Sequence, residues 1–328
     1  MTNVLLVGHS ARAHAIAEAF NKNKAVKLYS FMKSKNPGIA LLSEDVLIGS
    51  YSDLESIKEF AKKNKIDFAF IGPEDPLNDG VVDALQEIGI ASVGPTQSLA
   101  KLETSKSFTR DLLKKYDIDG NPKFNVFNNN NLNEINDFLN ELNEVVIKPD
   151  GLTGGKGVRV QGDHFNTKEE ALDYCKEVLE THESVIVEEK LDGEEFSLQC
   201  LTDGKAVIMT PPVQDHKRAY ENDVGPNTGG MGSYSSENHL LPFLKKEHVD
   251  AALEITRKVA DAIHEETSEY YKGVMYGGFI LTKEGVKLIE YNARFGDPEA
   301  MNVLPLLKTD FASICQSIIV QELDRVKV

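Results

Sequence analysis

The sequence predicts a multi-domain protein of the α/β and α+β classes, in which an N-terminal parallel α/β domain precedes a mixed region of strands and helices. Three observations support this fold class. The chain has 328 residues, more than one ordinary domain needs. Residues 1 to about 95 alternate short β-branched apolar runs with helical patterns. Further along, a strand, a glycine-rich loop, a strand and a helix follow one another.

The N-terminal domain shows a regular succession of strands and helices. NVLLVG, AVKLYSF, DVLIG and DFAFIG read as strands, and helices are expected over 11–21 and after Asp53. In open α/β sheets ligands collect outside the carboxyl ends of the strands, where Gly8 and the run Gly72, Pro73 and Glu74 fall. GHSARA has one glycine where a dinucleotide fingerprint has three, which argues against NAD. A phosphate at this helix start and a purely structural role for Arg12 both stay open.

A second domain follows a polar boundary. Residues 104–116 read as a capped helix, and turn-rich stretches cover 117–123 and 128–131. We therefore expect a domain over 1–103 and a second region over 104–328, with a small lid subdomain over about 122–190 and the remainder over about 191–328. The elements expected there are the strands EVVIKP, VRV and SVIVEE, a helix over about 167–180, longer strands within 194–214, a helix over 245–267 and a hairpin over 273–292.

Composition excludes several classes of protein. Hydrophobic residues make up 41% and charged residues 27%, and no apolar run approaches the roughly 20 residues that span a bilayer. The amino terminus has no leader of the signal-peptide type, so we expect a cytoplasmic protein without a membrane partner. A net charge of -16 disfavours nucleic acid as a partner. Cys175, Cys200 and Cys315 lack paired spacing and are expected to be buried free thiols. A monomer is expected, although no residue pattern specifies the oligomeric state.

Two tracts combine charge with glycine. They are DHKRAYENDVGPNTGGMG, from Asp215 to Gly232, and EYNARFGDPE, from Glu290 to Glu299. Buried charge is costly and glycine weakens regular elements, so we expect neither tract to lie in the core. Backbone N–H groups can approach a phosphate closely where side chains are absent, and basic side chains neutralise the remaining charge. The tracts therefore predict a site for a polyanionic ligand.

The loop from Asp150 to Gly157 and the strand ending at Asn292 indicate phosphate and metal binding. Lys148 and Lys156 flank or lie within this glycine-rich loop, which suits a phosphate cover, although it is not a P-loop and a plain hairpin turn is the alternative. Glu290 and Asn292 are two apart on a strand, so both side chains leave one face. Their oxygens suit magnesium, and a solvent-facing alternation is the alternative.

The stretch SVIVEEKLDGEEFS is a candidate for nucleoside binding. The edge of the strand from Val185 to Glu189 could offer backbone groups to a purine, and Glu195 could accept bonds from ribose hydroxyls; a solvated acidic hairpin is the alternative. No Ser-His-Asp or Cys-His arrangement can be inferred, and the histidines show no metal-ligand spacing. Phosphoryl transfer needs no protein nucleophile, because aligned reactants and positive charge are sufficient.

Taken together, six tracts resemble one known family. They are GPEDPLNDGVVDAL (72–85), VGPTQSLAKLETSKSFTRDLL (93–113), IKPDGLTGGKGV (147–158), EEKLDGEEFS (188–197), DHKRAYENDVGPNTGGMGSYS (215–235) and IEYNARFGDPE (289–299). They resemble the phosphoribosylamine-glycine ligases, which are ATP-grasp enzymes of purine biosynthesis. The resemblance implies a pre-ATP-grasp domain followed by an ATP-grasp fold. It also implies ligation of glycine to 5-phosphoribosylamine through glycyl phosphate, giving glycinamide ribonucleotide, ADP and phosphate, with ATP and Mg²⁺ or Mn²⁺ required.

The resemblance also implies roles for individual residues. Arg294, Lys148 and Arg218 would be catalytic, Arg294 pairing with the glycine carboxylate, and Glu290 and Asn292 would bind the metal. ATP would be bound by Lys106, Lys148, Gly151, Gly154, Gly155, Lys156, Gly157, Glu188, Glu189, Lys190, Leu191, Glu195 and Asn227. The substrates would contact Gly8, Arg12, Pro37, Gly38, Gly72, Pro73, Glu74, Asp215, Lys217, Arg218, Gly229, Gly230, Arg294 and Asp297.

The chain departs from the family pattern in three places. The first loop reads GHSARAHA where the family usually has GSGGREHA, and the nucleotide loop reads GLTGGKG instead of GLAAGKG. The family normally continues into a small carboxyl-terminal domain, whereas this chain stops at Val328, so we expect a fragment lacking that domain. Two alternative functions follow: an MgATP-binding fragment without full catalytic activity, or another ATP-grasp carboxylate-amine ligase.

Overall fold

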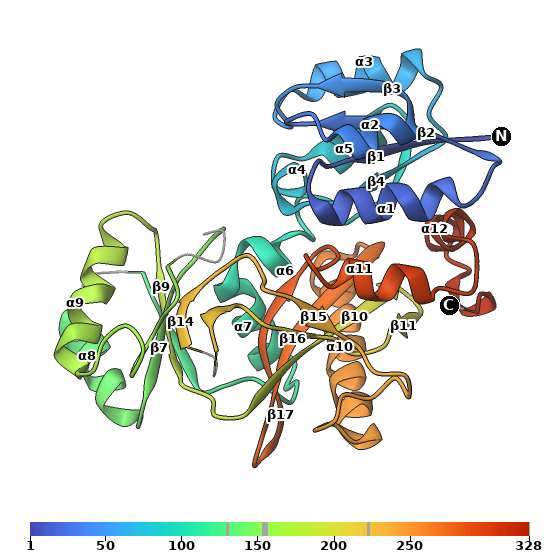
Figure 1. The fold of residues 1–328 in the computed structure, drawn as a ribbon. Helices are drawn as coiled ribbons and strands as arrows, with labels where there is room; N and C mark the ends of the chain where they lie inside the picture. The colour runs from blue at the N-terminus through green and yellow to red at the C-terminus, as the bar shows by residue number, and fades with distance from the viewer. Residues whose placement is uncertain (129–130, 153–156, 222–223, 328) are drawn as a thin grey trace.

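The N-terminal domain is a five-stranded parallel sheet in the order β3-β2-β1-β4-β5, with helices between the strands (Figure 1). The computed structural model describes residues 1–128, 131–152, 157–221 and 224–327. The predicted parallel α/β class is confirmed for this domain. Its elements are β1 (Thr2–Val7), α1 (Ala11–Asn21), β2 (Val26–Met32), α2 (Pro37–Leu42), β3 (Ser43–Ile48), α3 (Leu54–Lys63), β4 (Phe68–Ile71), α4 (Glu74–Asn78), α5 (Val81–Glu87) and β5 (Ala91–Val93).

A small antiparallel sheet with two helices forms a lobe of its own, in the order β6-β9-β7-β8 (Figure 1). Helices α8 and α9 pack against each other, and apolar side chains of this lobe form a separate core cluster that includes Ile135, Val145 and Val178. The elements are β6 (Phe124–Phe127), α8 (Leu132–Glu141), β7 (Val145–Pro149), β8 (Arg159–Val160), α9 (Lys168–Leu179) and β9 (Val185–Glu189).

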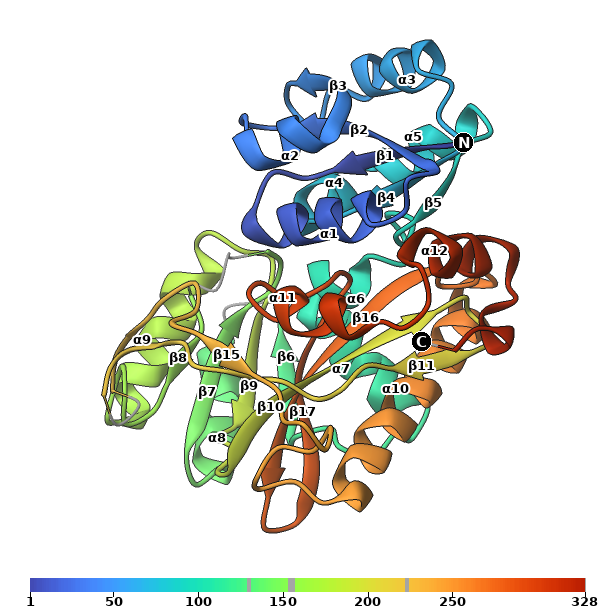
Figure 2. The same ribbon diagram turned by 45° about the vertical axis from the view of Figure 1, so that its right-hand side comes forward.

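A second antiparallel sheet, ordered β11-β10-β16-β17, lies between this lobe and the N-terminal domain, and α10 packs along it (Figure 2). The predicted capped helix over 104–116 is confirmed as α7 (Lys106–Lys115), which Ser105 caps by accepting a bond from the Phe108 N–H, and the short helix α6 precedes it. The elements are α6 (Lys101–Thr104), α7 (Lys106–Lys115), β10 (Glu194–Thr202), β11 (Val207–Met209), β12 (Gln214–Asp215), β13 (Arg218–Tyr220), β14 (Val224–Asn227), β15 (Ser233–Tyr234), α10 (Lys246–Thr267), β16 (Gly273–Thr282), β17 (Gly285–Asn292), α11 (Ala300–Val303), η1 (Leu304–Leu306), α12 (Phe311–Val320) and η2 (Leu323–Arg325).

The tract Glu290 to Glu299 is largely buried, so the expectation that it lies outside the core is wrong. Phe295 stacks on Phe70 of β4 with ring centroids 6.1 Å apart, and Phe311 of α12 lies 4.8 Å from Phe20 of α1. Apolar contacts of this kind hold the tract against the N-terminal domain. Its charged groups can be buried because each finds partners there, as described below.

The three cysteines are buried free thiols, as predicted. Across the residues that the structure describes, no single helix is long and apolar enough to cross a bilayer, and one bent pair, Ala300–Leu306 with Phe311–Val320, meets the length and composition of a span only when its two parts are combined.

Candidate active site

Strand β17 and the residues after it bring three predicted site residues together. The Asn292 Nδ2 group donates to Glu290 Oε1 at 3.4 Å, which confirms that the two side chains share one face of the strand. The Arg294 Nη2 group donates to Asn292 Oδ1 at 2.9 Å. Burial would raise the pKa of Glu290, but Lys217 and Lys148 hold it below its usual value, so this residue stays a carboxylate.

Arg294 also joins the second region to the N-terminal domain. Its Nε lies 3.1 Å from Glu74 Oε2, and Arg12 Nη2 lies 3.2 Å from the same oxygen. A second carboxylate, Glu103, lies 2.8 Å from Arg294 Nη2. Burial would lower the pKa of Arg294, but Glu103 and Glu74 raise it well above normal. Arg294, which was predicted to pair with the glycine carboxylate, is therefore already engaged along its Nε and Nη2 edge.

Arg12 is buried rather than displayed at the helix start. It is 5% exposed, its Nη1 donates to Phe295 O at 2.6 Å and its backbone N–H donates to Asp297 Oδ2 at 3.2 Å. Of the predicted substrate residues, the structure thus groups Arg12, Glu74 and Asp297 with Arg294. Glu103 belongs to the same group, and sequence reasoning missed it.

A second buried cluster beside β17 holds Lys148. Its Nζ lies 2.7 Å from Glu188 Oε2 and donates to Ile289 O at 3.2 Å. Arg110 of α7 binds Glu188 in bidentate fashion, at 2.6 and 3.0 Å, and donates to Leu288 O. Burial would raise the pKa of Glu188, but Arg110 and Lys148 lower it to about 2. Arg110 was not identified from the sequence. A basic residue among the apolar, buried positions of α7 could have indicated a buried ion pair there.

The glycine-rich loop starts at an anchored carboxylate. Asp150 accepts bonds from Ser105 at 3.3 Å and from Ser184 at 3.3 Å, and also binds Ser107 Oγ. Lys106 Nζ donates to Gly151 O at 2.7 Å. The predicted phosphate ligands Gly154, Gly155 and Lys156 lie outside the described residues, and Gly157, which is described, accepts from Tyr174 Oη at 2.6 Å.

The prediction that Val185–Glu189 offers a free strand edge to a purine is wrong. Strand β9 pairs with β6 on one side and β7 on the other, so it is internal to its sheet. Beyond the strand, the Lys190 N–H donates to Glu144 O at 2.9 Å and its Nζ donates to Gln161 O at 2.9 Å. Glu189 Oε1 accepts from the Lys123 N–H at 2.7 Å. The predicted adenine contact at Glu188–Leu191 cannot use the backbone ladder of β9.

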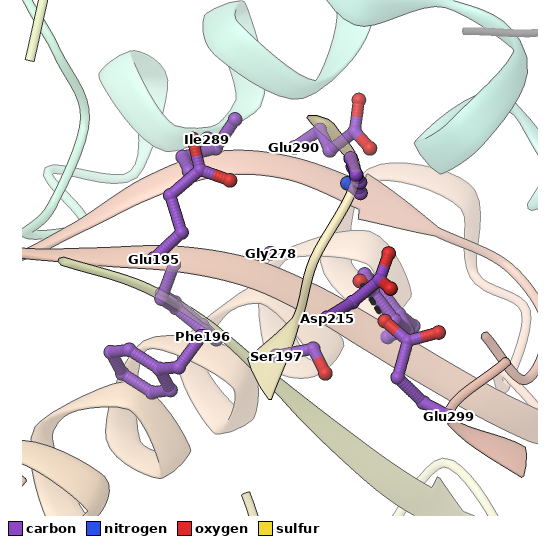
Figure 3. A pocket seen from close by; sticks show the side chains of 11 residues that line it. Glu195, Phe196, Ser197, Asp215, Gly278, Ile289, Glu290 and Glu299 are labelled. Atoms are coloured by element: carbon purple, nitrogen blue, oxygen red, sulfur yellow. Dashed lines mark hydrogen bonds between the residues drawn. The ribbon is translucent and has the colours of Figure 1, made fainter. Parts of the chain in front are cut away.

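The first glycine-rich tract faces an acidic pocket over β10, β16 and β17. Glu195, Asp215, Glu290 and Glu299 line it together with Lys217 and Ser197, and Figure 3 shows Asp215 and Glu299 close to each other. Burial and the charge of Glu299 raise the pKa of Asp215 to about 6. Desolvation would lower the pKa of Lys217, but the surrounding carboxylates, Glu290 first among them, raise it.

Gly230 allows this tract to approach the second one. A Cβ on Gly230 would lie 2.9 Å from Pro298 Cδ and 3.2 Å from Asp215 Oδ1, and its φ is +119°. Arg218 points elsewhere: it binds Asp163 of the small lobe and donates to Gly225 O at 2.9 Å. Asn227 and Gly229 are exposed.

The remaining predicted substrate residues follow the carboxyl ends of β1, β2 and β4. A Cβ on Gly8 would lie 3.0 Å from Pro73 Cδ, and the Gly72 N–H donates to Val7 O at 2.8 Å. Pro37 starts α2, and a Cβ on Gly38 would lie 2.3 Å from His14 Cε1, so a side chain there would displace the His14 ring. His9 of the altered first loop lies 2.8 Å from the Tyr51 hydroxyl.

The donor set at Glu290 and Asn292 fits a hard divalent cation. Among the residues that the structure describes, no group of three or more His, Cys, Asp and Glu side chains could hold a metal. A carboxylate and an adjacent amide oxygen nevertheless match Mg²⁺, which is usually bound by one or two protein ligands together with water and substrate phosphates. An amide oxygen has two lone pairs, so Asn292 Oδ1 can accept from Arg294 and still coordinate an ion.

Comparisons with known proteins agree with this geometry. The family model "Phosphoribosylglycinamide synthetase, N domain" matches residues 2–103, and "Phosphoribosylglycinamide synthetase, ATP-grasp (A) domain" matches residues 104–300. A phosphoribosylamine-glycine ligase of Methanococcus maripaludis is 52% identical over 99% of this chain and 74% of its own length.

Solved structures show the same arrangement. Phosphoribosylamine-glycine ligase from Thermotoga maritima has a TM-score of 0.80 and 26% identity, covering 98% of this chain and 76% of that one. The N5-carboxyaminoimidazole synthetase from Staphylococcus aureus has a TM-score of 0.68 at 14% identity, covering 90% and 71%. The second likeness shows the ATP-grasp fold alone.

Proposed function

This chain belongs to the phosphoribosylglycinamide synthetase family, and we propose that it ligates glycine to 5-phosphoribosylamine at the expense of ATP. The observation that carries this function is the agreement of both family models, in order, over residues 2–300. The predicted ligase class is the one named for these relatives. The alternative of another carboxylate-amine ligase is disfavoured, because the likeness to N5-carboxyaminoimidazole synthetase extends only to the fold.

The reaction proceeds in two displacements. A carboxylate oxygen of glycine attacks the γ-phosphorus of ATP, and the bond to the β-phosphate oxygen breaks, giving glycyl phosphate and ADP. The amine of 5-phosphoribosylamine then attacks the acyl carbon, the carbon–oxygen bond to phosphate breaks, and the amine loses a proton. The protein has to align the reactants and stabilise negative charge on the transferred group.

The described contacts support specific roles. Lys148 and Lys106, both next to the loop after β7, would bind ATP phosphates. The Nη1 end of Arg294 would contact the glycine carboxylate through its second N–H, because Nη1 donates only to Phe295 O, at 3.3 Å, whereas Nε and Nη2 are held by Glu74, Glu103 and Asn292. The acidic pocket beside Asp215 and Glu299 would attract the glycine ammonium. The loops that follow β1 and β4, with Gly8 and Gly72, would accept phosphoribosylamine.

Glu290 and Asn292 would hold Mg²⁺ or Mn²⁺. Such an ion neutralises charge on the transferred phosphoryl group.

The function is tested by ADP release from the 328-residue chain with MgATP and glycine, with and without phosphoribosylamine generated in the same tube. Turnover that requires both substrates is expected. Binding of MgATP without glycine-dependent turnover would instead identify this chain as a nucleotide-binding fragment.

A further inference from the structure

Glu103 is a buried carboxylate at the junction of the two regions, and it is not among the residues proposed to bind ATP, glycine or phosphoribosylamine. It lies on the short helix α6 and is 8% exposed. Its Oε2 accepts a bond from the Ala293 N–H at 2.7 Å, and its Oε1 lies 2.8 Å from Arg294 Nη2. One side chain thus fixes both the backbone and a guanidinium in the tract that follows β17.

The contacts of Glu103 continue to the cation ligands. Arg294 Nη2 donates to Asn292 Oδ1 at 2.9 Å, and Asn292 Nδ2 donates to Glu290 Oε1 at 3.4 Å. The bond to Ala293 restrains the backbone immediately after Asn292. The hydrogen bond from Arg294 to Asn292 Oδ1 uses one lone pair of this oxygen and leaves the other lone pair for an ion.

A buried carboxylate needs a reason to be retained. Replacing buried ionic groups with apolar ones of similar volume is often neutral or stabilising. A contribution to stability therefore does not by itself explain a buried carboxylate at position 103. The ionic group here is nearly self-neutralising, since Arg12 and Arg294 face Glu74 and Glu103. Its geometric effect is to fix the Nε and Nη2 edge of Arg294, with Glu74 at Nε and Glu103 at Nη2.

We propose that Glu103 is a positioning residue, which acts through Arg294 and Ala293 to set the orientation of Asn292 and Glu290 toward the cation and of Arg294 toward glycine. The proposal rests on the ligase function proposed above. Residues that hydrogen-bond to metal ligands without touching the metal orient those ligands, and their loss typically costs roughly 10- to 100-fold in metal affinity or activity. The proposal assigns this role to Glu103.

The test compares Glu103→Gln with wild type and with Tyr291→Phe. The glutamine can still accept from the Ala293 N–H but presents no charge to Arg294. Tyr291→Phe is the matched control, because it removes another buried hydrogen bond on β17, from Tyr291 Oη to Thr256 Oγ1 at 3.0 Å. Two quantities are measured: the affinity for Mn²⁺ in the presence of ADP, and the KM for glycine and for ATP with kcat.

For Glu103→Gln we expect weaker Mn²⁺ binding, by about 10-fold or more, and a raised KM for glycine, with the KM for ATP changed much less. Tyr291→Phe should change only thermal stability. Glu103→Asp should recover part of the loss if the variant is folded. Mn²⁺ affinity and glycine KM within about twofold of wild type, in a Glu103→Gln protein with native circular dichroism, would overturn the proposal. Because Mn²⁺ binding needs no turnover, it decides the role of Glu103 even if wild type fails the ligation test.

Discussion

Arg294 and Glu74 form an ion pair, with Nε and Oε2 3.1 Å apart, across 220 residues of sequence. The pair joins the tract after β17 to the first residue of α4 in the N-terminal domain. Because Arg12 contacts the same Glu74 oxygen, one carboxylate bridges two guanidinium groups. The proposed glycine site is therefore built partly from the N-terminal domain, and its geometry depends on how the two regions are held together.

Replacing Arg294 by alanine is expected to lower kcat/KM for glycine by roughly 10²- to 10³-fold, the range for removal of one positioned donor. The variant also leaves Glu103 and Glu74 with fewer partners, so the free energy of unfolding should fall by about 3–5 kcal/mol. Steady-state kinetics and denaturant unfolding measure the two effects separately. Unchanged turnover in a folded Arg294→Ala protein would show that Arg294 has only a structural role.

The pair of Glu188 with Arg110 should appear in the pH dependence of stability. Because the folded state lowers the pKa of Glu188 from 4.5 to about 2, its stabilising effect is complete above pH 4.5 and is lost as the pH falls toward 2. Wild type should therefore lose unfolding free energy between pH 5 and pH 3, and Glu188→Gln should lose less over that interval. Urea unfolding at the two pH values measures this difference.

Glu141→Gln is the matched control for that experiment. Glu141 pairs with Lys123 at 3.1 Å, but its side chain is 59% exposed. Exposed pairs contribute little to stability, so this variant should keep the wild-type pH dependence. If Glu188→Gln and Glu141→Gln behave alike, the buried cluster around Lys148 does not set the acid sensitivity of the fold.

Local patterns were sufficient to predict the N-terminal sheet and the pairing of Glu290 with Asn292. Strands such as Thr2–Val7 carry apolar runs between turn residues, and the two-residue period of a strand places Glu290 and Asn292 on one face. The capped helix over 104–116 was predicted from its local pattern as well, and Ser105 is its N-cap.

The missed features depend on partners that are distant in sequence. Glu103 binds the Ala293 N–H 190 residues away, and Arg110 binds Leu288 O 178 residues away. The internal position of β9 follows from the strand order, which no local pattern encodes. For the same reason the burial of the tract around Phe295 could not be predicted, since its charges are tolerated only through tertiary ion pairs.

Gly230→Ala should separate the two charged tracts. The added Cβ would lie 2.9 Å from Pro298 Cδ, and the positive φ of +119° disfavours any side chain. We expect destabilisation of roughly 1–3 kcal/mol, measured as a lower Tm. Gly229→Ala is the control, because nothing lies within 4 Å of a Cβ at Gly229. An equal Tm for the two variants would mean that the tracts can move apart without cost.

Asp215→Asn should stabilise the protein at neutral pH while impairing the reaction. Burial and Glu299 raise the pKa of Asp215 from 3.8 to about 6, so the folded state binds this proton more tightly than the unfolded chain does. The ionised carboxylate is therefore a destabilising group above pH 6, and this cost disappears as the pH falls through 3.8. The asparagine variant should gain roughly 1–2 kcal/mol of unfolding free energy at pH 7.5, less than the full linkage value because Asp215 is only partly buried.

A carboxylate kept at such a cost is expected where function needs negative charge, here opposite the glycine ammonium, so the Asp215→Asn variant should show a raised KM for glycine. Thermal unfolding at pH 7.5 and pH 4, with glycine kinetics at pH 7.5, tests both parts, and a variant less stable than wild type at pH 7.5 would contradict the repulsion between Asp215 and Glu299.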